Sequence, residues 1–265
     1  MFKTPFLVVL ALSCLTSAFD EYAPVAPGTL TVEPQFVYSS ITGAYDASGS
    51  KQDIPSGTSM TGEGYGLQLK IGTIGGLDVE AALLYDHATE ESPTFSTSTD
   101  GFLRPDLAIK YLSGVGLGAF AGVDLPLGSA EVVGMDPPFS FYFGGIIVRR
   151  SDRLSFNGLL TYAVTLENSE KYAPGDVLDV KLKPQFDVTN AFGPYLALEF
   201  QKVYDGSIDG QSLHNSGYLL TLQPGANISL TRTCALEIGV PITLAGENEY
   251  SAWGLLAQVR ISMRP

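Results

Sequence analysis

The sequence predicts an all-β protein, a twelve-stranded antiparallel transmembrane β-barrel with short periplasmic turns and longer outer loops. Three observations lead to this fold class. Apolar residues alternate with polar or small ones over runs whose length suits the ~9–11 residues of a tilted membrane-crossing strand. The connections between these runs are alternately long and short, as in outer-membrane barrels. Aromatic residues gather near both ends of the runs, where their amphipathic rings would meet lipid headgroups.

The alternation is clearest between Tyr218 and Leu244. Every second residue from Tyr218 to Leu230 is apolar, and after a tight link the same face resumes from Leu236 to Leu244. Apart from Leu219 and Pro241, the residues between them are polar or small. Strands of soluble proteins are usually shorter, about five or six residues. One apolar and one polar face over this length indicate lipid on one side and a water-filled lumen on the other.

Twelve such runs are expected as strands, an even number as in single-chain bacterial barrels. In chain order they are residues 28–39, 61–72, 77–87, 102–112, 115–125, 138–149, 153–166, 177–188, 194–204, 218–230, 235–244 and 250–263. Each has an apolar face, which begins respectively at Leu30, Tyr65, Leu77, Leu103, Val115, Phe139, Leu154, Val180, Leu196, Tyr218, Leu236 and Trp253. The run 138–149 is apolar on both faces, and its Gly144-Gly145 pair suggests a β-bulge that switches faces.

The connections sort by length in strict alternation. The short ones are residues 73–76, 113–114, 150–152, 189–193 and 231–234. The others, mostly longer, are residues 40–60, 88–101, 126–137, 167–176, 205–215 and 245–249. A soluble β-sandwich has no reason to sort its loops in this way. The order therefore predicts a barrel in the outer membrane of a Gram-negative bacterium, with both termini in the periplasm.

The start of the chain is organised as a signal peptide. Lys3 supplies a positive charge, residues 6–12 an apolar core, and Ala18 ends a small-residue cleavage site. We therefore expect residues 1–18 to be a signal peptide. Lipidation of Cys14 is the alternative.

The remaining organisation is simple. Residues 19–27 form a proline-rich lead-in, either a periplasmic spacer or a plug in the lumen, and residues 28–265 form the barrel. A mature chain would keep only Cys234, and hence no intrachain disulfide. The sequence pI near 4.4 argues against nucleic acid as a partner. No cysteine or histidine cluster has metal-ligand spacing, so we expect no cofactor.

Charged residues on the inward faces are the candidate site. Counting antiparallel pairs outward from the short turns predicts contacts of Lys70 with Glu80, Arg104 with Asp124, and Lys183 with Glu199. These pairs either hold the wall together or form a constriction that screens permeants by charge and size. The candidate residues along the permeant path are Lys70, Glu80, Arg104, Asp124, Lys181, Lys183 and Glu199.

Catalytic signals are thin. The stretch His214-Asn215-Ser216-Gly217 is similar to the His-x-Ser-Asn-Gly stretch of outer-membrane phospholipases, with Gly217 in place of the asparagine. A serine nucleophile also needs a base oriented by a third group, and no orienting partner is evident nearby. We expect no enzyme. A lipid hydrolase that uses His214 and Ser216 is one alternative, and a structural or surface-interaction barrel is another.

Four short stretches carry a family resemblance: residues 27–33 (PGTLTVE), 106–111 (DLAIKY), 123–128 (VDLPLG) and 236–240 (LEIGV). Together they resemble bacterial outer-membrane barrels of the meta-pathway phenol-degradation, transporter-like family. The resemblance implies a channel for small hydrophobic or aromatic compounds, with outer-membrane lipid and the barrel-assembly machinery as partners. Such barrels usually end in an aromatic residue, whereas this chain ends in Met263-Arg264-Pro265.

Overall fold

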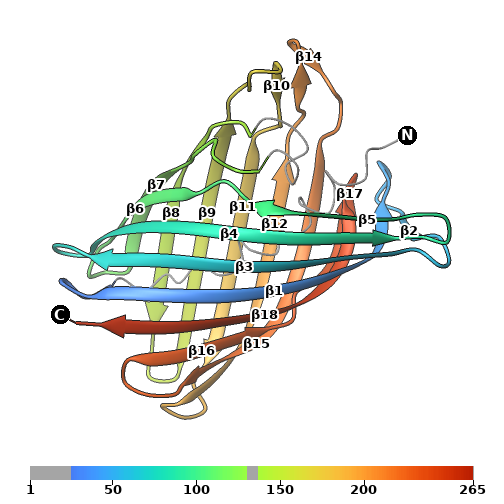
Figure 1. Ribbon diagram of the computed structural model, residues 1–265. Coiled ribbons are helices and arrows are strands. Elements are labelled where there is room, and N and C mark those ends of the chain that lie inside the picture. Colours follow the sequence, from blue (N-terminus) through green and yellow to red (C-terminus); the bar gives the residue numbers. More distant parts are fainter. Residues whose placement is uncertain (1–24, 130–136, 265) are drawn as a thin grey trace.

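The computed structural model describes residues 25–129 and 137–264, which fold as strands, turns and loops. They form a closed antiparallel barrel of twelve strands (Figure 1). The wall consists of β1 (Leu30–Tyr45), β3 (Ser59–Gly72), β4 (Leu77–Glu91), β5 (Ser96–Phe102), β6 (Asp106–Leu112), β7 (Leu117–Asp124), β8 (Ser140–Arg150), β9 (Leu154–Thr165), β11 (Val177–Phe186), β12 (Phe192–Val203), β15 (Gly217–Ser229), β16 (Cys234–Gly239), β17 (Ile242–Glu247) and β18 (Tyr250–Met263). Two of the twelve strands are interrupted, one as β5 and β6 and the other as β16 and β17. No helix in the described ranges is long and apolar enough to cross a membrane.

The barrel closes where its first and last strands meet. β1 and β18 pair from Leu30 opposite Met263 to Ala44 opposite Tyr250. Closure matters because an unpaired strand edge carries backbone groups that hydrocarbon cannot satisfy. The predicted pairing of the terminal strands is thus confirmed.

The apolar face of the strands points outward. On β3, the side chain of Tyr65 is 50% exposed, whereas Lys70 on the opposite face is 1% exposed. Ile238 of β16 is 37% exposed and therefore lies on the outer surface. In a β-sandwich, such a residue would be buried between two sheets. Large apolar residues exposed along β3, β4, β6, β12 and β16 to β18 give the barrel an apolar outer surface, the arrangement of a wall that faces lipid.

Two predicted strands are interrupted at proline. The expected strand 102–112 is divided by residues 103–105, which end in Pro105, and the expected strand 235–244 is divided at Val240-Pro241. Proline has no N–H to donate to the ladder. The register of β15 is the same on both sides of the second break, with Gly225 opposite Gly239 and Leu222 opposite Ile242.

The bulge expected at Gly144-Gly145 is wrong. The pairings of β8 with β7 and with β9 run through both glycines without a register shift. Phe141 and Phe143 point outward, while Ile146 is buried on the inward face. A Cβ at position 144 would lie 2.5 Å from the Phe120 ring, so glycine leaves room for that ring inside the barrel.

Outside the wall, short strands decorate the loops. β2 (Lys51–Asp53) pairs with β1, and β10 (Tyr172–Ala173), β13 (Ser207–Ile208) and β14 (Gln211–Ser212) form a small sheet. Figure 1 shows β10 and β14 beyond one end of the barrel, which we call the loop end. The tight turns that were predicted lie at the opposite end, which we call the turn end.

Two loop-end connections are shorter than predicted. Within residues 88–101, β4 and β5 continue as a hairpin that turns at residues 92–95. Between β17 and β18 only Asn248 and Glu249 remain, and Asn248 has a φ of 53°. Asparagine tolerates this left-handed conformation, so the turn can be tight. The alternation of long and short connections is therefore less strict than the sequence indicates.

Glycines on the inward face make room for large neighbours. Tyr195 of β12 is opposite Gly225 of β15, and a Cβ at position 225 would lie 2.3 Å from the tyrosine ring and 2.5 Å from the Ile238 carbonyl oxygen. We therefore expect Gly225→Ala to lower the free energy of unfolding by about 1–3 kcal/mol, the usual cost of overpacking. Urea unfolding of the barrel in detergent micelles measures this.

The matched control for that substitution is Gly114→Ala. A Cβ at position 114 meets no atom within 4 Å, so this variant should unfold at the urea concentration of the wild type. Equal midpoints for both variants would show that Tyr195 does not pack against Gly225 as described.

Candidate functional site

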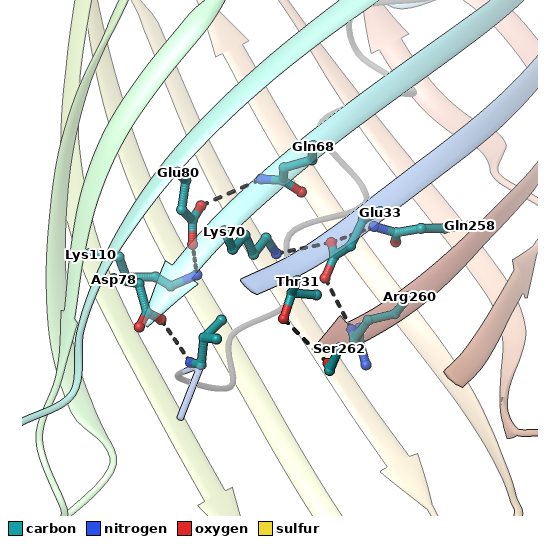
Figure 2. Close-up of polar contacts among 11 residues, drawn as sticks. Thr31, Glu33, Gln68, Lys70, Asp78, Glu80, Lys110, Gln258, Arg260 and Ser262 are labelled. Carbon is teal, nitrogen blue, oxygen red and sulfur yellow. Dashed lines mark hydrogen bonds and ion pairs between the residues drawn. The ribbon is translucent and has the colours of Figure 1, made fainter. Parts of the chain in front are cut away.

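Strand alternation brings charged side chains from separate strands together inside the barrel. Figure 2 shows one group, from β1, β3, β4, β6 and β18, whose side chains point toward one another. A second group comes from β11, β12 and β16. We call the two groups together the charged layer: Glu33, Lys70, Asp78, Glu80, Lys110 and Arg260, with Asp179, Lys181, Lys183, Glu199 and Glu237.

Glu33 is the centre of the first group. Its carboxylate accepts hydrogen bonds from Gln258 Nε2 at 2.7 Å and Arg260 Nε at 3.1 Å, and Lys70 Nζ lies 3.1 Å away (Figure 2). The Glu33 side chain is 0% exposed. Charge-assisted contacts of this kind are the strong ones, so Glu33 joins β1 to β3 on one side and to β18 on the other.

For Lys70, the predicted register with Glu80 is confirmed, but the ion pair is formed with a different acid. The register places Lys70 opposite Glu80, but the lysine forms its ion pair with Glu33. Glu80 instead accepts a hydrogen bond from Lys110 of β6, and another from Gln68 Nε2 at 3.4 Å (Figure 2). Counting outward from one turn identifies the partner within a hairpin, whereas each strand in a barrel has a second neighbour.

The predicted contact of Arg104 with Asp124 is confirmed. Arg104 Nη2 lies 3.7 Å from Asp124 Oδ2. Its other terminal nitrogen donates to the Pro138 carbonyl oxygen at 3.1 Å and to Ser140 Oγ at 2.6 Å. Arg104 thereby bridges the interruption between β5 and β6 to the start of β8.

The predicted contact of Lys183 with Glu199 is wrong by two residues. Glu199 lies opposite Lys181, with 3.6 Å between Lys181 Nζ and Glu199 Oε1. Lys183 Nζ instead donates to Glu237 Oε1 of β16 at 2.6 Å and lies 4.2 Å from the centre of the Tyr195 ring. The turn between β11 and β12 is centred one residue earlier than expected, which moves the register by two.

Tyr195 and Glu237 are the residues that the sequence-based site lacks. Gln223 Nε2 donates to the Tyr195 hydroxyl at 2.6 Å, and the ring lies beneath Lys183. A tyrosine on the inward face opposite a glycine was the signal available in the sequence. Glu237, the partner of Lys183, had no such signal in the sequence, because β12 and β15 separate β11 from β16 in the wall.

The lead-in reaches the barrel interior at the turn end. The Val25 N–H donates to Asp78 Oδ2 at 3.0 Å (Figure 2). A Cβ at Gly72 would meet the carbonyl oxygens of Ala26 and Val25, so the lead-in lies directly against the end of β3. The predicted signal peptide 1–18, Cys14 and residues 19–24 of the lead-in lie outside the described residues.

Comparisons with known proteins identify the fold. No protein-family model and no curated protein matches the chain. Among solved structures, an outer membrane channel from Pseudomonas putida F1 superimposes with a TM-score of 0.77 at 16% identity, over 92% of this chain and 100% of that one. The fold is that of an outer-membrane β-barrel.

Two autotransporter domains share the barrel more distantly. The β domain of the Bordetella autotransporter BrkA matches with a TM-score of 0.61 at 11% identity, over 89% of this chain and all of that one. The translocator domain of NalP from Neisseria meningitidis matches with a TM-score of 0.58 at 12% identity, over 98% of this chain and 99% of that one. At these identities the likeness concerns the fold alone.

The contact that a lipid hydrolase would need is not formed. In the described part of the chain, His214 Nδ1 lies 3.5 Å from Ser212 Oγ and 3.8 Å from Asp205 Oδ2, and Ser216 donates its backbone N–H to Asp205. Ser212 and Asp205 thus lie near the same nitrogen of the His214 ring, Nδ1. In a catalytic triad, the serine and the aspartate contact different ring nitrogens of the histidine. The lipid-hydrolase alternative needs His214 beside Ser216, whereas the described contacts of the His214 ring are with Ser212 and Asp205.

At the loop end, burial raises the pKa of Glu249 to about 7. A glutamate in an unfolded chain titrates near 4.3, so between these values the folded barrel holds a proton that the unfolded chain releases. We expect this group to stabilise the barrel at pH 4 to 5 and to lose that contribution as the pH rises through 7. Urea unfolding at pH 5 and pH 8 measures the change.

The control for this pH dependence is Glu249→Gln, which cannot titrate. The fall in stability from pH 5 to pH 8 should be smaller in the variant than in the wild type, and the difference between the two isolates Glu249. The same fall in both proteins would contradict the assignment.

Proposed function

We propose that this protein is an outer-membrane channel for passive uptake of small hydrophobic or aromatic compounds. The observation that carries the proposal is the opposite character of the two faces of the wall. Apolar side chains cover the outside, and charged side chains from both halves of the chain line the inside. A polar interior in a closed barrel is the arrangement of barrels with an aqueous lumen.

The proposal includes the membrane, the insertion route and the orientation of the chain. It would lie in outer-membrane lipid after insertion by the barrel-assembly machinery, with both termini in the periplasm. That the solved barrel with a TM-score of 0.77 is an outer membrane channel supports the proposal. The permeant path would pass the charged layer and the Arg104–Asp124 contact, so the proposed path residues are Lys70, Glu80, Arg104, Asp124, Lys181, Lys183 and Glu199.

A structural barrel without a transport role is the second candidate, favoured by one observation. Most acids of the charged layer have a lysine or arginine within 4.0 Å, for example Glu33 with Lys70 and Glu237 with Lys183. Pairs of this kind neutralise one another and hold the wall together. Such a barrel would carry no current.

Conductance across planar lipid bilayers separates the two candidates. A channel gives discrete current steps in at least one polarity, and uptake into proteoliposomes should be faster for phenol than for a sugar of similar size. Lys183→Ala combined with Glu237→Ala removes one pair without changing the net charge, and should alter the step size. No current in either polarity would overturn the channel.

A further inference from the structure

Two acids lie inside the barrel on the loop side of the charged layer. Asp86 and Glu90 are inward-facing residues of β4, and they are 0% and 7% exposed. Neither carboxylate oxygen of Asp86 has a hydrogen-bond partner, and Glu90 Oε2 has none, within the part of the chain that the structure describes. Leaving a buried carboxylate charged and unpaired is costly, so a cation or a bound proton at these oxygens is favoured.

The wall strands around Asp86 and Glu90 place no positive charge inward at this level, and Lys51 of β2, at the loop end of β1, directs its Nζ to Thr42 Oγ1 at 3.2 Å. On each of these strands, every second residue faces inward. The inward residues at this level start at Val37 of β1, Met60 of β3, Thr97 of β5 and Tyr250 of β18. None of them is lysine, arginine or histidine. In the charged layer, by contrast, Lys70, Lys110, Lys181 and Lys183 each lie within 4.0 Å of an acid. Most acids of the charged layer therefore have positively charged partners, whereas Asp86 and Glu90 have none on these strands.

An apolar surface adjoins the two carboxylates. Val37, Ile41, Ala88, Ala252 and Leu256 pack together, with Met60 and Tyr250 against them. A Cβ at Gly64 would lie 2.9 Å from Asp86 Oδ1 and 3.7 Å from Val37 Cβ, so the carboxylate borders the apolar cluster.

Glycine flanks Asp86 on both sides. Gly64 of β3 and Gly101 of β5 are its partners in the two ladders. The wall beside the carboxylate consequently carries no side chain at either position. We call Asp86, Glu90 and the adjoining apolar cluster the acidic chamber.

We propose that the acidic chamber binds an organic cation, with its ammonium group at the carboxylates and its apolar body on the cluster. The cation would supply the missing charge partner, and its apolar body would bury area against the half-buried Met60 and Tyr250. The Tyr250 ring adds a surface that favours cations. This inference rests on the proposed function, because the cation would be the permeant, and it narrows the permeants to cationic aromatic or apolar compounds.

Isothermal titration calorimetry of the folded barrel in detergent micelles tests the site. The probes are benzyltrimethylammonium and, as an anion of similar size, benzenesulfonate. We expect the cation to bind at least tenfold more tightly than the anion. We expect Asp86→Asn combined with Glu90→Gln to weaken cation binding at least tenfold.

The matched control is Glu91→Gln. Glu91 is adjacent in sequence, exposed and on the other face of β4, so this variant removes a negative charge from the same strand outside the chamber and should leave binding unchanged. Far-ultraviolet circular dichroism and the gel shift on heating establish that each variant is folded. Should a folded double variant still bind like the wild type, or should wild type bind both probes equally or neither, the acidic chamber is not a cation site.

The outcomes also separate this inference from the proposed function. Cation binding in a barrel that carries no current would support the site and overturn the channel. Current without cation binding would support the channel and overturn the site.

Discussion

Replacing Glu33 by alanine should lower the free energy of unfolding by about 3–5 kcal/mol, the usual cost of breaking a buried ion pair. Glu33 is fully buried, and its carboxylate is shared by Lys70, Gln258 and Arg260. Alanine removes all three contacts at once, next to the seam where β1 and β18 close the barrel. Urea unfolding in detergent micelles measures the loss.

Two comparisons make this prediction specific. Glu91→Gln removes a negative charge from the exposed face of β4 and should change stability by about 0.5 kcal/mol or less, as surface substitutions do. Glu33→Gln combined with Lys70→Met replaces the pair by neutral groups of similar size and should be less harmful than Glu33→Ala, because the buried Lys70 charge is removed together with its partner and only the more exposed Arg260 loses a counter-charge. A Glu33→Ala barrel as stable as the Glu91→Gln control would contradict the described contacts.

Replacing Leu198 by arginine should destabilise the barrel in lipid vesicles by about 2–4 kcal/mol, the cost of a cation on the lipid face near the bilayer midplane. Leu198 is 38% exposed and lies midway along β12. In the two ladders it is opposite Leu182 and Leu222. Three adjacent leucines on the outer surface need an apolar medium, and an arginine among them would have to leave it.

The position-matched control is Leu230→Arg. Leu230 is 57% exposed and follows the end of β15 at the turn end, where an arginine costs only about 0–1 kcal/mol. Unfolding from vesicles in urea compares the two variants. Equal small losses at both positions would show that the outer face of β12 does not contact hydrocarbon.

The two faces of the wall could be predicted from the sequence because strand geometry has a fixed period. Alternation alone assigns Leu69 to the outside and Lys70 to the inside, and the structure agrees. The same holds for closure, since strands with one apolar face in lipid can have no free edge. The interruption at Val240-Pro241 was not predicted, although a proline inside an expected strand is its signal in the sequence.

The choice of partner inside the lumen depends on the closed barrel. Lys70 has Glu80 on one side and Glu33 on the other, and only the relative positions of three strands select Glu33. Lys183 reaches Glu237 past two intervening strands, a contact that pairwise counting cannot identify. The turn between β11 and β12 is centred one residue earlier than expected. Glu199, the expected partner of Lys183, therefore lies opposite Lys181.

The sequence by itself determined which side chains face lipid and which face the lumen, because that depends on a period of two along each strand. The tertiary structure decided which of the lumen charges meet and which stay apart. Lys70 found its acid on the far side, whereas Asp86 faces glycine on both flanks. Registers across several strands set these distances, and short-range charge interactions depend on them steeply.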